Sequence, residues 1–178
     1  MERGLRVVRA EPSQVAELAD VAARTFPLAC PPSVGPQDVA AFVAENLSQS
    51  QFERYLADLD RSVLIAVTDS RILGYAMMIR GVPDDPDVSK AVQARPSVEL
   101  SKMYVLPESH GSSVAAALMN AALDHAMTLA AASVWLGVNQ RNARAQRFYT
   151  KFGFTITGTK TFRLGEHVEA DYVMVRPV

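Results

Sequence analysis

The residues best suited to chemistry follow a predicted strand at 98–105, where a proline and several small residues lead into a long helical pattern. Pro107 interrupts the strand, and Glu108, Ser109 and His110 lead to a helix that is predicted to begin at Gly111 and to continue through Ser112 and Ser113. The first amide groups of a helix have no partners inside the helix, and the helix dipole places partial positive charge there. Small side chains let an anion approach these amides, so the stretch suits a phosphate-binding turn. Small residues also begin ordinary helices, which is the alternative interpretation.

A second stretch follows a predicted strand at 133–138 and continues into a short helix at 142–152. The residues of interest in this stretch are Asn142, Ala145, Tyr149, Gly153 and Phe154. Gly153 is typical of the residue just after a helix, where a left-handed backbone conformation is common. Asn142 at the helix start would serve as an N-cap, as a ligand contact, or as both.

Together the two stretches resemble the GCN5-related N-acetyltransferase (GNAT) superfamily. In that family a strand followed by V-x-P-x-x-[Q/R]-x-x-G-x-[G/A] binds the pyrophosphate of acetyl-CoA, and a later strand is followed by N-x-x-A-x-x-x-Y-x-x-x-G-F. The second motif is complete here. In the first, His110 stands where Gln or Arg is usual, Ser113 replaces a glycine, and Ala115 matches. The segments 99–105 and 158–171 look most like bacterial spermidine/spermine N-acetyltransferases of the PaiA type.

The resemblance implies one GNAT domain over residues 1–178, with acetyl-CoA as co-substrate. Its fold class is α/β (mixed α+β), with a mixed, mostly antiparallel central sheet of about seven strands flanked by helices. Backbone groups of the strand would bind the pantetheine arm, and the amides of 111–116 would bind the pyrophosphate. The residues implied to contact the cofactor are Met103, Tyr104, Val105, His110, Gly111, Ser112, Ser113, Val114, Ala115, Ala116, Asn142 and Tyr149.

Amide formation needs a base and an acid, because the attacking amine loses a proton and the departing thiolate gains one. An alkyl amine has a pKa of about 10.4, so it is mostly protonated at neutral pH. The resemblance implies Tyr149 as the acid; simple packing is the alternative. Glu99 is the candidate base, acting through a water, with an ordinary salt-bridged glutamate as the alternative. Gly137 occupies a strand position where some relatives carry a glutamate, so that second base is missing.

The elements that position these residues follow from hydrophobic periodicity. Alternation along the strand predicts that Glu99 shares a face with Ser101, Met103 and Val105, with Leu100, Lys102 and Tyr104 on the other. The predicted order is β-α-α-β-β-β-α-β-α-β-β, with the longest helix at 111–130 and the Pro-rich segment 81–87 as a loop. The predicted strands are 5–9, 62–68, 72–79, 98–105, 133–138, 154–163 and 168–175.

Composition excludes several other classes of protein. The chain has 178 residues, of which 49% are hydrophobic and 21% charged, as expected of one globular domain rather than a disordered chain. Because no run of about 18 apolar residues exists and the start does not look like a signal peptide, we expect no membrane span and no secretion. The net charge of −1 favours no nucleic-acid partner. Cys30 is the single cysteine, which fits a reducing, cytoplasmic location.

These patterns predict an acetyl-CoA-dependent N-acetyltransferase that transfers the acetyl group directly to a small primary amine, without a metal. A polyamine is one candidate acceptor, for which Glu99, Glu45, Asp58 and Asp60 would supply negative charge, and a homodimer is a candidate assembly. Two alternatives stay open. One is a catalytically weak acyl-CoA-binding regulatory module, and the other is an acetyltransferase for protein N-termini or lysines.

Overall fold

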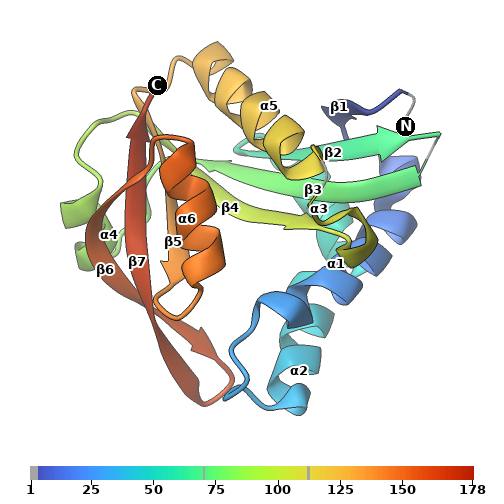
Figure 1. Ribbon diagram of the computed structural model, residues 1–178, viewed down its shortest axis with the longest axis horizontal. Helices are drawn as coiled ribbons and strands as arrows, with labels where there is room; N and C mark the ends of the chain where they lie inside the picture. The colour runs from blue at the N-terminus through green and yellow to red at the C-terminus, as the bar shows by residue number, and fades with distance from the viewer. Residues whose placement is uncertain (1–3, 70, 112) are drawn as a thin grey trace.

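The computed structural model describes residues 4–69, 71–111 and 113–178, which form a seven-stranded sheet with helices on both faces (Figure 1). The strand order is β1-β2-β3-β4-β5-β7-β6, and every neighbouring pair is antiparallel except β4 and β5. The strands are β1 (Arg6–Arg9), β2 (Arg61–Thr68), β3 (Arg71–Arg80), β4 (Ser97–Val105), β5 (Ser133–Asn139), β6 (Thr155–Leu164) and β7 (His167–Pro177). The mixed, mostly antiparallel sheet predicted from the sequence is confirmed.

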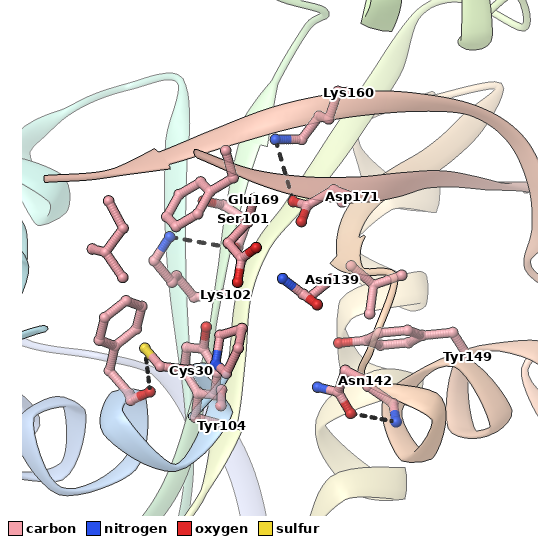
Figure 2. A pocket seen from close by; sticks show the side chains of 18 of the residues that line it. Cys30, Ser101, Lys102, Tyr104, Asn139, Asn142, Tyr149, Lys160, Glu169 and Asp171 are labelled. Carbon is pink, nitrogen blue, oxygen red and sulfur yellow. Dashed lines mark hydrogen bonds and ion pairs between the residues drawn. The ribbon is translucent and has the colours of Figure 1, made fainter. Parts of the chain in front are cut away.

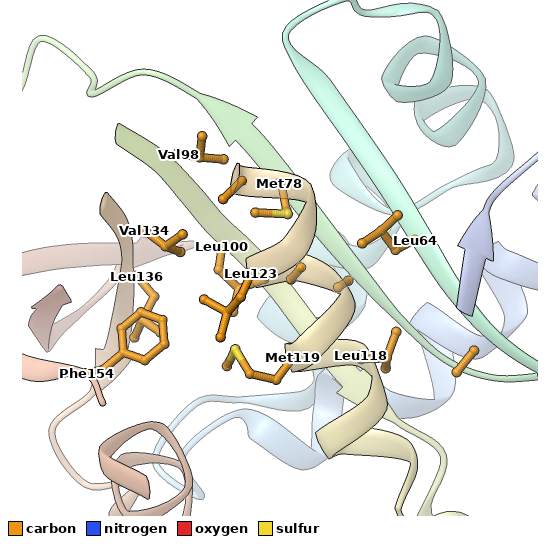
Figure 3. Packing of buried hydrophobic residues seen from close by; sticks show 14 of the residues in the cluster. Leu64, Met78, Val98, Leu100, Leu118, Met119, Leu123, Val134, Leu136 and Phe154 are labelled. Atoms are coloured by element: carbon orange, nitrogen blue, oxygen red, sulfur yellow. The ribbon is translucent and has the colours of Figure 1, made fainter. Parts of the chain in front are cut away.

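Six α-helices in the described part of the chain cover the sheet, and they divide the core between its two faces. They are α1 (Val15–Ala29), α2 (Pro36–Asn46), α3 (Gln49–Ala57), α4 (Pro86–Ala91), α5 (Val114–Thr128) and α6 (Ala143–Lys151). Under α5 lies one buried cluster, in which Leu118 and Met119 meet Leu100 and Leu136 of the central strands (Figure 3). The helices α1 to α3 cover the opposite face around Phe52. No helix among the described residues is long and apolar enough to cross a membrane.

Two predictions about helices are corrected. The Pro-rich segment is not loop throughout, because α4 begins at Pro86. The Asp85 carboxylate accepts hydrogen bonds from the amides of Asp87 (2.9 Å) and Val88 (3.4 Å), so it caps this helix. Helix α5 begins at Val114 rather than at 111, since Gly111 has a φ of +79° and cannot continue a right-handed helix. It spans 15 residues, the same length as α1, so the two helices share the greatest length among the described residues.

The parallel pair β4 and β5 is joined only at its beginning. Three residue pairs form the ladder, the last between Glu99 and Trp135, although both strands continue well beyond them. The joined end is held by Ser133, whose hydroxyl contacts the Ser97 hydroxyl at 2.8 Å and donates to the carbonyl of Ala94 at 2.7 Å. Beyond Glu99 the two strands separate, so one edge of β4 is open toward the space between them.

The predicted alternation along β4 is wrong beyond Leu100 because the strand contains a bulge. Leu100 pairs with Met78 and Lys102 with Met77, which leaves Ser101 as an extra residue without an opposite partner in β3. An inserted residue reverses the order of the side chains that follow it. Met103 therefore packs in the cluster under α5, whereas Lys102 shares the opposite face with Glu99 and Tyr104.

Gly74 on β3 allows the close approach of β3 and β4 beside the opening. A Cβ atom there would lie 2.7 Å from the backbone oxygen of Tyr104 and 3.2 Å from Leu118. We expect Gly74→Ser to reduce the free energy of unfolding by about 1–3 kcal/mol, as overpacking does elsewhere. Gly35→Ser is the matched control, since nothing lies within 4 Å of its Cβ position. Equal melting temperatures of the two variants would contradict this account of the packing.

Candidate active site

The separation of β4 and β5 leads into a cavity of about 170 Å³ on the side of the sheet opposite α5 (Figure 2). Its walls come from β4, β5, the β6–β7 hairpin, the first part of α6 and the end of α1, which are far apart in the sequence. The polar residues that line it are Cys30, Glu99, Ser101, Lys102, Tyr104, Asn139, Asn142, Tyr149, Lys160, Glu169 and Asp171. Both candidate catalytic residues, Glu99 and Tyr149, therefore border one cavity.

Tyr149 is fixed by the way α6 begins and ends. At the start, the Asn142 side chain accepts a hydrogen bond from the amide of Ala145 at 3.1 Å, so Asn142 is the N-cap. At the end, Gly153 has a φ of +89°, and its amide donates to Thr150 while the amide of Phe154 donates to the carbonyl of Tyr149. This is a Schellman motif, which confirms Gly153 as the residue that ends the helix.

The Tyr149 ring packs against its aromatic neighbours, and its hydroxyl points into the cavity. Its ring centroid lies 5.7 Å from that of Phe148 and 6.0 Å from that of Phe154. Figure 2 shows the hydroxyl directed toward the cavity from the α6 side. Burial raises the pKa of Tyr149 to about 12, so the phenol keeps its proton throughout the neutral range. Packing and a hydroxyl presented to the cavity are therefore combined in one residue.

Glu99 and Lys102 project into the same cavity from β4. Burial raises the pKa of Glu99, and the positive charges of Lys102, Lys160 and Arg61 oppose that rise. Burial also lowers the pKa of Lys102, and the carboxylate of Glu99 opposes it. For both groups the charged form is therefore less favoured than it would be in water. A carboxylate with a raised pKa is also a stronger base than an exposed carboxylate.

A second pair of charges enters the cavity from the β6–β7 hairpin. The ammonium of Lys160 lies 3.6 Å from the carboxylate of Asp171, and both side chains are largely buried. Burial raises the pKa of Asp171, while Lys160 lowers it. The stem of Lys160 crosses β5 at Gly137, where a Cβ atom would lie 2.5 Å from the Lys160 Cε. The missing side chain of Gly137 thus makes room for a lysine from another strand.

The predicted phosphate-binding turn lies at the end of β4. His110 closes it, with its Nε2 atom 2.9 Å from the carbonyl oxygen of Val105, and Ser113 is the N-cap residue of α5. Val114, Ala115 and Ala116 form the first helical turn. Ser112 lies outside the described residues. The open edge of β4 and this helix start follow one another in space, which fits a ligand that has both an amide-rich arm and phosphates.

Several residues around the cavity were not predicted. Lys102, Asn139, Lys160, Glu169 and Asp171 had no role in the sequence analysis, because single charged residues on strands carry no periodic or spacing signal. Conversely, Glu45, Asp58 and Asp60 are exposed and do not line the cavity; Asp58 instead pairs with Arg61 at 3.2 Å. The polar lining of the acceptor side thus comes mainly from the sheet rather than from the helices above it.

Comparison with known proteins identifies the family. A model of the acetyltransferase (GNAT) family matches residues 18–154. An uncharacterized N-acetyltransferase of Mycobacterium bovis is 59% identical over 160 residues, covering 90% of this chain and 95% of that protein. The chain belongs to the GNAT family of acetyltransferases. It is therefore an N-acetyltransferase that uses acetyl-CoA.

Solved structures of other GNAT proteins have the same fold. The PaiA N-acetyltransferase of Thermoplasma acidophilum, in complex with coenzyme A, matches with a TM-score of 0.76 at 17% identity and covers 98% of this chain and 99% of its own. A ribosomal-protein-alanine N-acetyltransferase of Brucella melitensis matches with a TM-score of 0.71 at 16% identity, covering 97% of this chain and 99% of its own. At such identities these GNAT relatives establish the fold and leave the acceptor open.

Acetyl-CoA should stabilise the folded protein in a dose-dependent way. A ligand that binds only the native state adds about 2.7 kcal/mol to the free energy of unfolding at a hundredfold excess over Kd. Pantetheine, which lacks the phosphates that the turn at 111–116 would bind, should raise the melting temperature much less. Equal shifts with the two compounds would show that the turn contributes no phosphate binding.

Proposed function

We propose that this protein transfers the acetyl group of acetyl-CoA directly to the primary amine of a small molecule bound in the cavity. One observation carries the proposal. A carboxyl group with a raised pKa, Glu99, and a phenol that keeps its proton, Tyr149, border the same cavity at the point where β4 and β5 separate. Acetyl-CoA supplies the activated acyl group, and these two residues supply the proton acceptor and the proton donor.

Glu99 would remove the proton from the attacking amine. Its position on β4 is fixed by pairing with Ile79 on one side and Trp135 on the other, at the last joined position of β4 and β5. The raised pKa of the Glu99 carboxyl brings its basicity closer to that of the amine. A water between carboxylate and amine would complete the transfer.

Tyr149 would donate a hydrogen bond to the sulfur as the carbon–sulfur bond breaks. The new carbon–nitrogen bond replaces the carbon–sulfur bond, so one proton leaves the nitrogen and one is needed at the sulfur. The phenol is suited to this task because it remains protonated and faces the cavity. The Tyr149 ring packs edge-to-face against the rings of Phe148 and Phe154, and this packing limits its movement.

Direct transfer is favoured over an acetylated cysteine by the state of Cys30. This thiol is the only one in the chain and lines the cavity, but burial raises its pKa to about 11. Its sulfur also lies 3.4 Å from the carbonyl oxygen of Phe26, to which the thiol donates. Because a thiolate is the nucleophilic form, a thiol held in its protonated state is a poor intermediate carrier of the acetyl group.

Replacing Tyr149 by phenylalanine tests the proton donor. The ring and its packing are kept, so the affinity for acetyl-CoA should change little, while kcat should fall by roughly 10²–10⁴-fold, as for loss of a general acid. Tyr172→Phe is the control, since Tyr172 lies outside the cavity lining. Activity of Tyr149→Phe within a few-fold of the parent would reduce Tyr149 to a packing residue.

The pH dependence of kcat tests the base. Glu99 acts only when deprotonated, and its pKa is raised, so the rate should begin to fall on acidification at a higher pH than for an exposed glutamate. In Glu99→Gln this acid limb should disappear and kcat should fall by roughly 10²–10⁴-fold. Glu53→Gln, on the exposed surface of α3, is the control. An unchanged acid limb in Glu99→Gln would assign it to another group.

The finer predictions about the acceptor are separated by a screen that follows thiol release from acetyl-CoA. A polyamine acceptor has the support of three carboxylates in the cavity lining, those of Glu99, Glu169 and Asp171. A regulatory module would bind acetyl-CoA and release no thiol with any amine.

The homodimer and the cytoplasmic location stay predictions, to be checked by light scattering and by imaging of the tagged protein.

A further inference from the structure

Among the described residues that line the cavity, Lys160, Asp171 and Glu169 each have an acidic or basic side chain within 4.0 Å, whereas Glu99 and Lys102 do not. Lys160 pairs with Asp171 at 3.6 Å. Glu169 lies 3.6 Å from the His167 ring and accepts a hydrogen bond from Ser33 at 3.5 Å. Among the described residues, neither Glu99 nor Lys102 has an oppositely charged side chain within 4.0 Å. The cavity therefore offers one carboxylate and one ammonium that favour each other's charge across more than 4.0 Å without forming an ion pair.

The Lys102 ammonium lies in the cavity at a position where a bound anion would pair with its charge. Its contacts are the backbone carbonyl of Ser101 at 3.5 Å and the face of the Phe42 ring at 5.8 Å. The carbonyl, the ring face and the more distant Glu99 carboxylate compensate the buried ammonium only in part, and burial lowers the pKa of Lys102. An anion bound beside it would form a charge-assisted hydrogen bond in a site with little water.

The bulge at Ser101 places this ammonium on the same face of β4 as Glu99. Without the extra residue, strict alternation would turn Lys102 toward α5. Figure 2 shows the Lys102 ammonium and the Tyr149 hydroxyl entering the cavity from opposite sides. An acceptor whose amine reacts near Tyr149 and Glu99 would therefore extend its remaining groups toward Lys102.

We propose that the acetyl acceptor is a zwitterion, a primary amine that also carries an anionic group, and that Lys102 binds this group. The inference rests on the proposed function and names the class of its acceptor. A carboxylate and a phosphate share the chemistry that Lys102 recognises. A polyamine would instead bring a second ammonium toward Lys102, and the repulsion between like charges selects against it.

Matched pairs of acceptors test this proposal with the unmodified protein and acetyl-CoA. The pairs are leucine with leucinamide, β-alanine with its amide, and phosphoethanolamine with ethanolamine; spermidine is added as the polycation. We expect kcat/KM to be at least tenfold higher for the anionic member of at least one pair, and the pair identifies carboxylate or phosphate. An amino-acid amide has the less basic amine and so more of its reactive form, which makes this test conservative.

The variant Lys102→Met then removes the ammonium and keeps a flexible apolar side chain. The preference for the anionic member should fall by roughly 10–100-fold, the scale of one hydrogen bond to a charged group. Most of the change should lie in KM for the anionic acceptor, because Lys102 binds a group remote from the reacting nitrogen. Lys90→Met, on the exposed surface of α4, is the control and should keep the parent preference.

The outcomes separate this inference from the proposed function. If both members of every pair react equally, or if spermidine is preferred, the zwitterion is wrong and the N-acetyltransferase proposal stands. If Lys102→Met keeps the preference, Lys102 is not the anion site. If no amine releases thiol, the proposed transfer to small amines is wrong, and the pairs are compared by thermal shift with coenzyme A present. Equal stabilisation by both members then overturns the zwitterion as well.

Discussion

The site depends on the early separation of β4 and β5. Two parallel strands in the middle of a sheet would normally satisfy each other's backbone groups along their whole length. Here the ladder ends at Glu99, and Ser97 and Ser133 secure only the closed end with side-chain hydrogen bonds. The separation would give the amide-rich arm of acetyl-CoA a strand edge to pair with, as we propose, and it opens the cavity on the opposite side from α5. Every proposed role follows from where a residue stands relative to that opening.

Several charged side chains are buried around this opening, although burying a charge costs free energy. An apolar lining would stabilise the fold more simply, since each buried charge costs free energy unless it is paired. The protein instead places Glu99, Lys102, Lys160 and Asp171 around one cavity. Burial raises the pKa values of Glu99 and Asp171 and lowers the pKa of Lys102. Such arrangements are common in active sites, because the groups are then ready to exchange protons or to bind a charged substrate.

Most of the fold was predictable from the sequence because its elements have strong periodic patterns and clear ends. The seven strands and the helix ended by Gly153 follow from local rules. The bulge at Ser101 did not, because one extra residue in a strand leaves no mark in composition. That single residue decides that Lys102, rather than Met103, faces the cavity. The motif residues of the candidate site were found by resemblance, whereas Lys160 and Asp171 enter it through strand register, which depends on tertiary structure.

The absence of a side chain at Gly137 affects the charges that line the cavity. A Cβ atom there would lie 2.5 Å from the Lys160 Cε, so a larger residue would displace that lysine. In this chain the glycine leaves that space to the stem of Lys160, whose ammonium then pairs with Asp171 on the adjacent strand. The result is a positive charge where a second carboxylate could stand. It leaves Glu99 as the free carboxylate nearest the joined end of β4 and β5, and it moves the balance of the cavity toward acceptors that are not simply cationic.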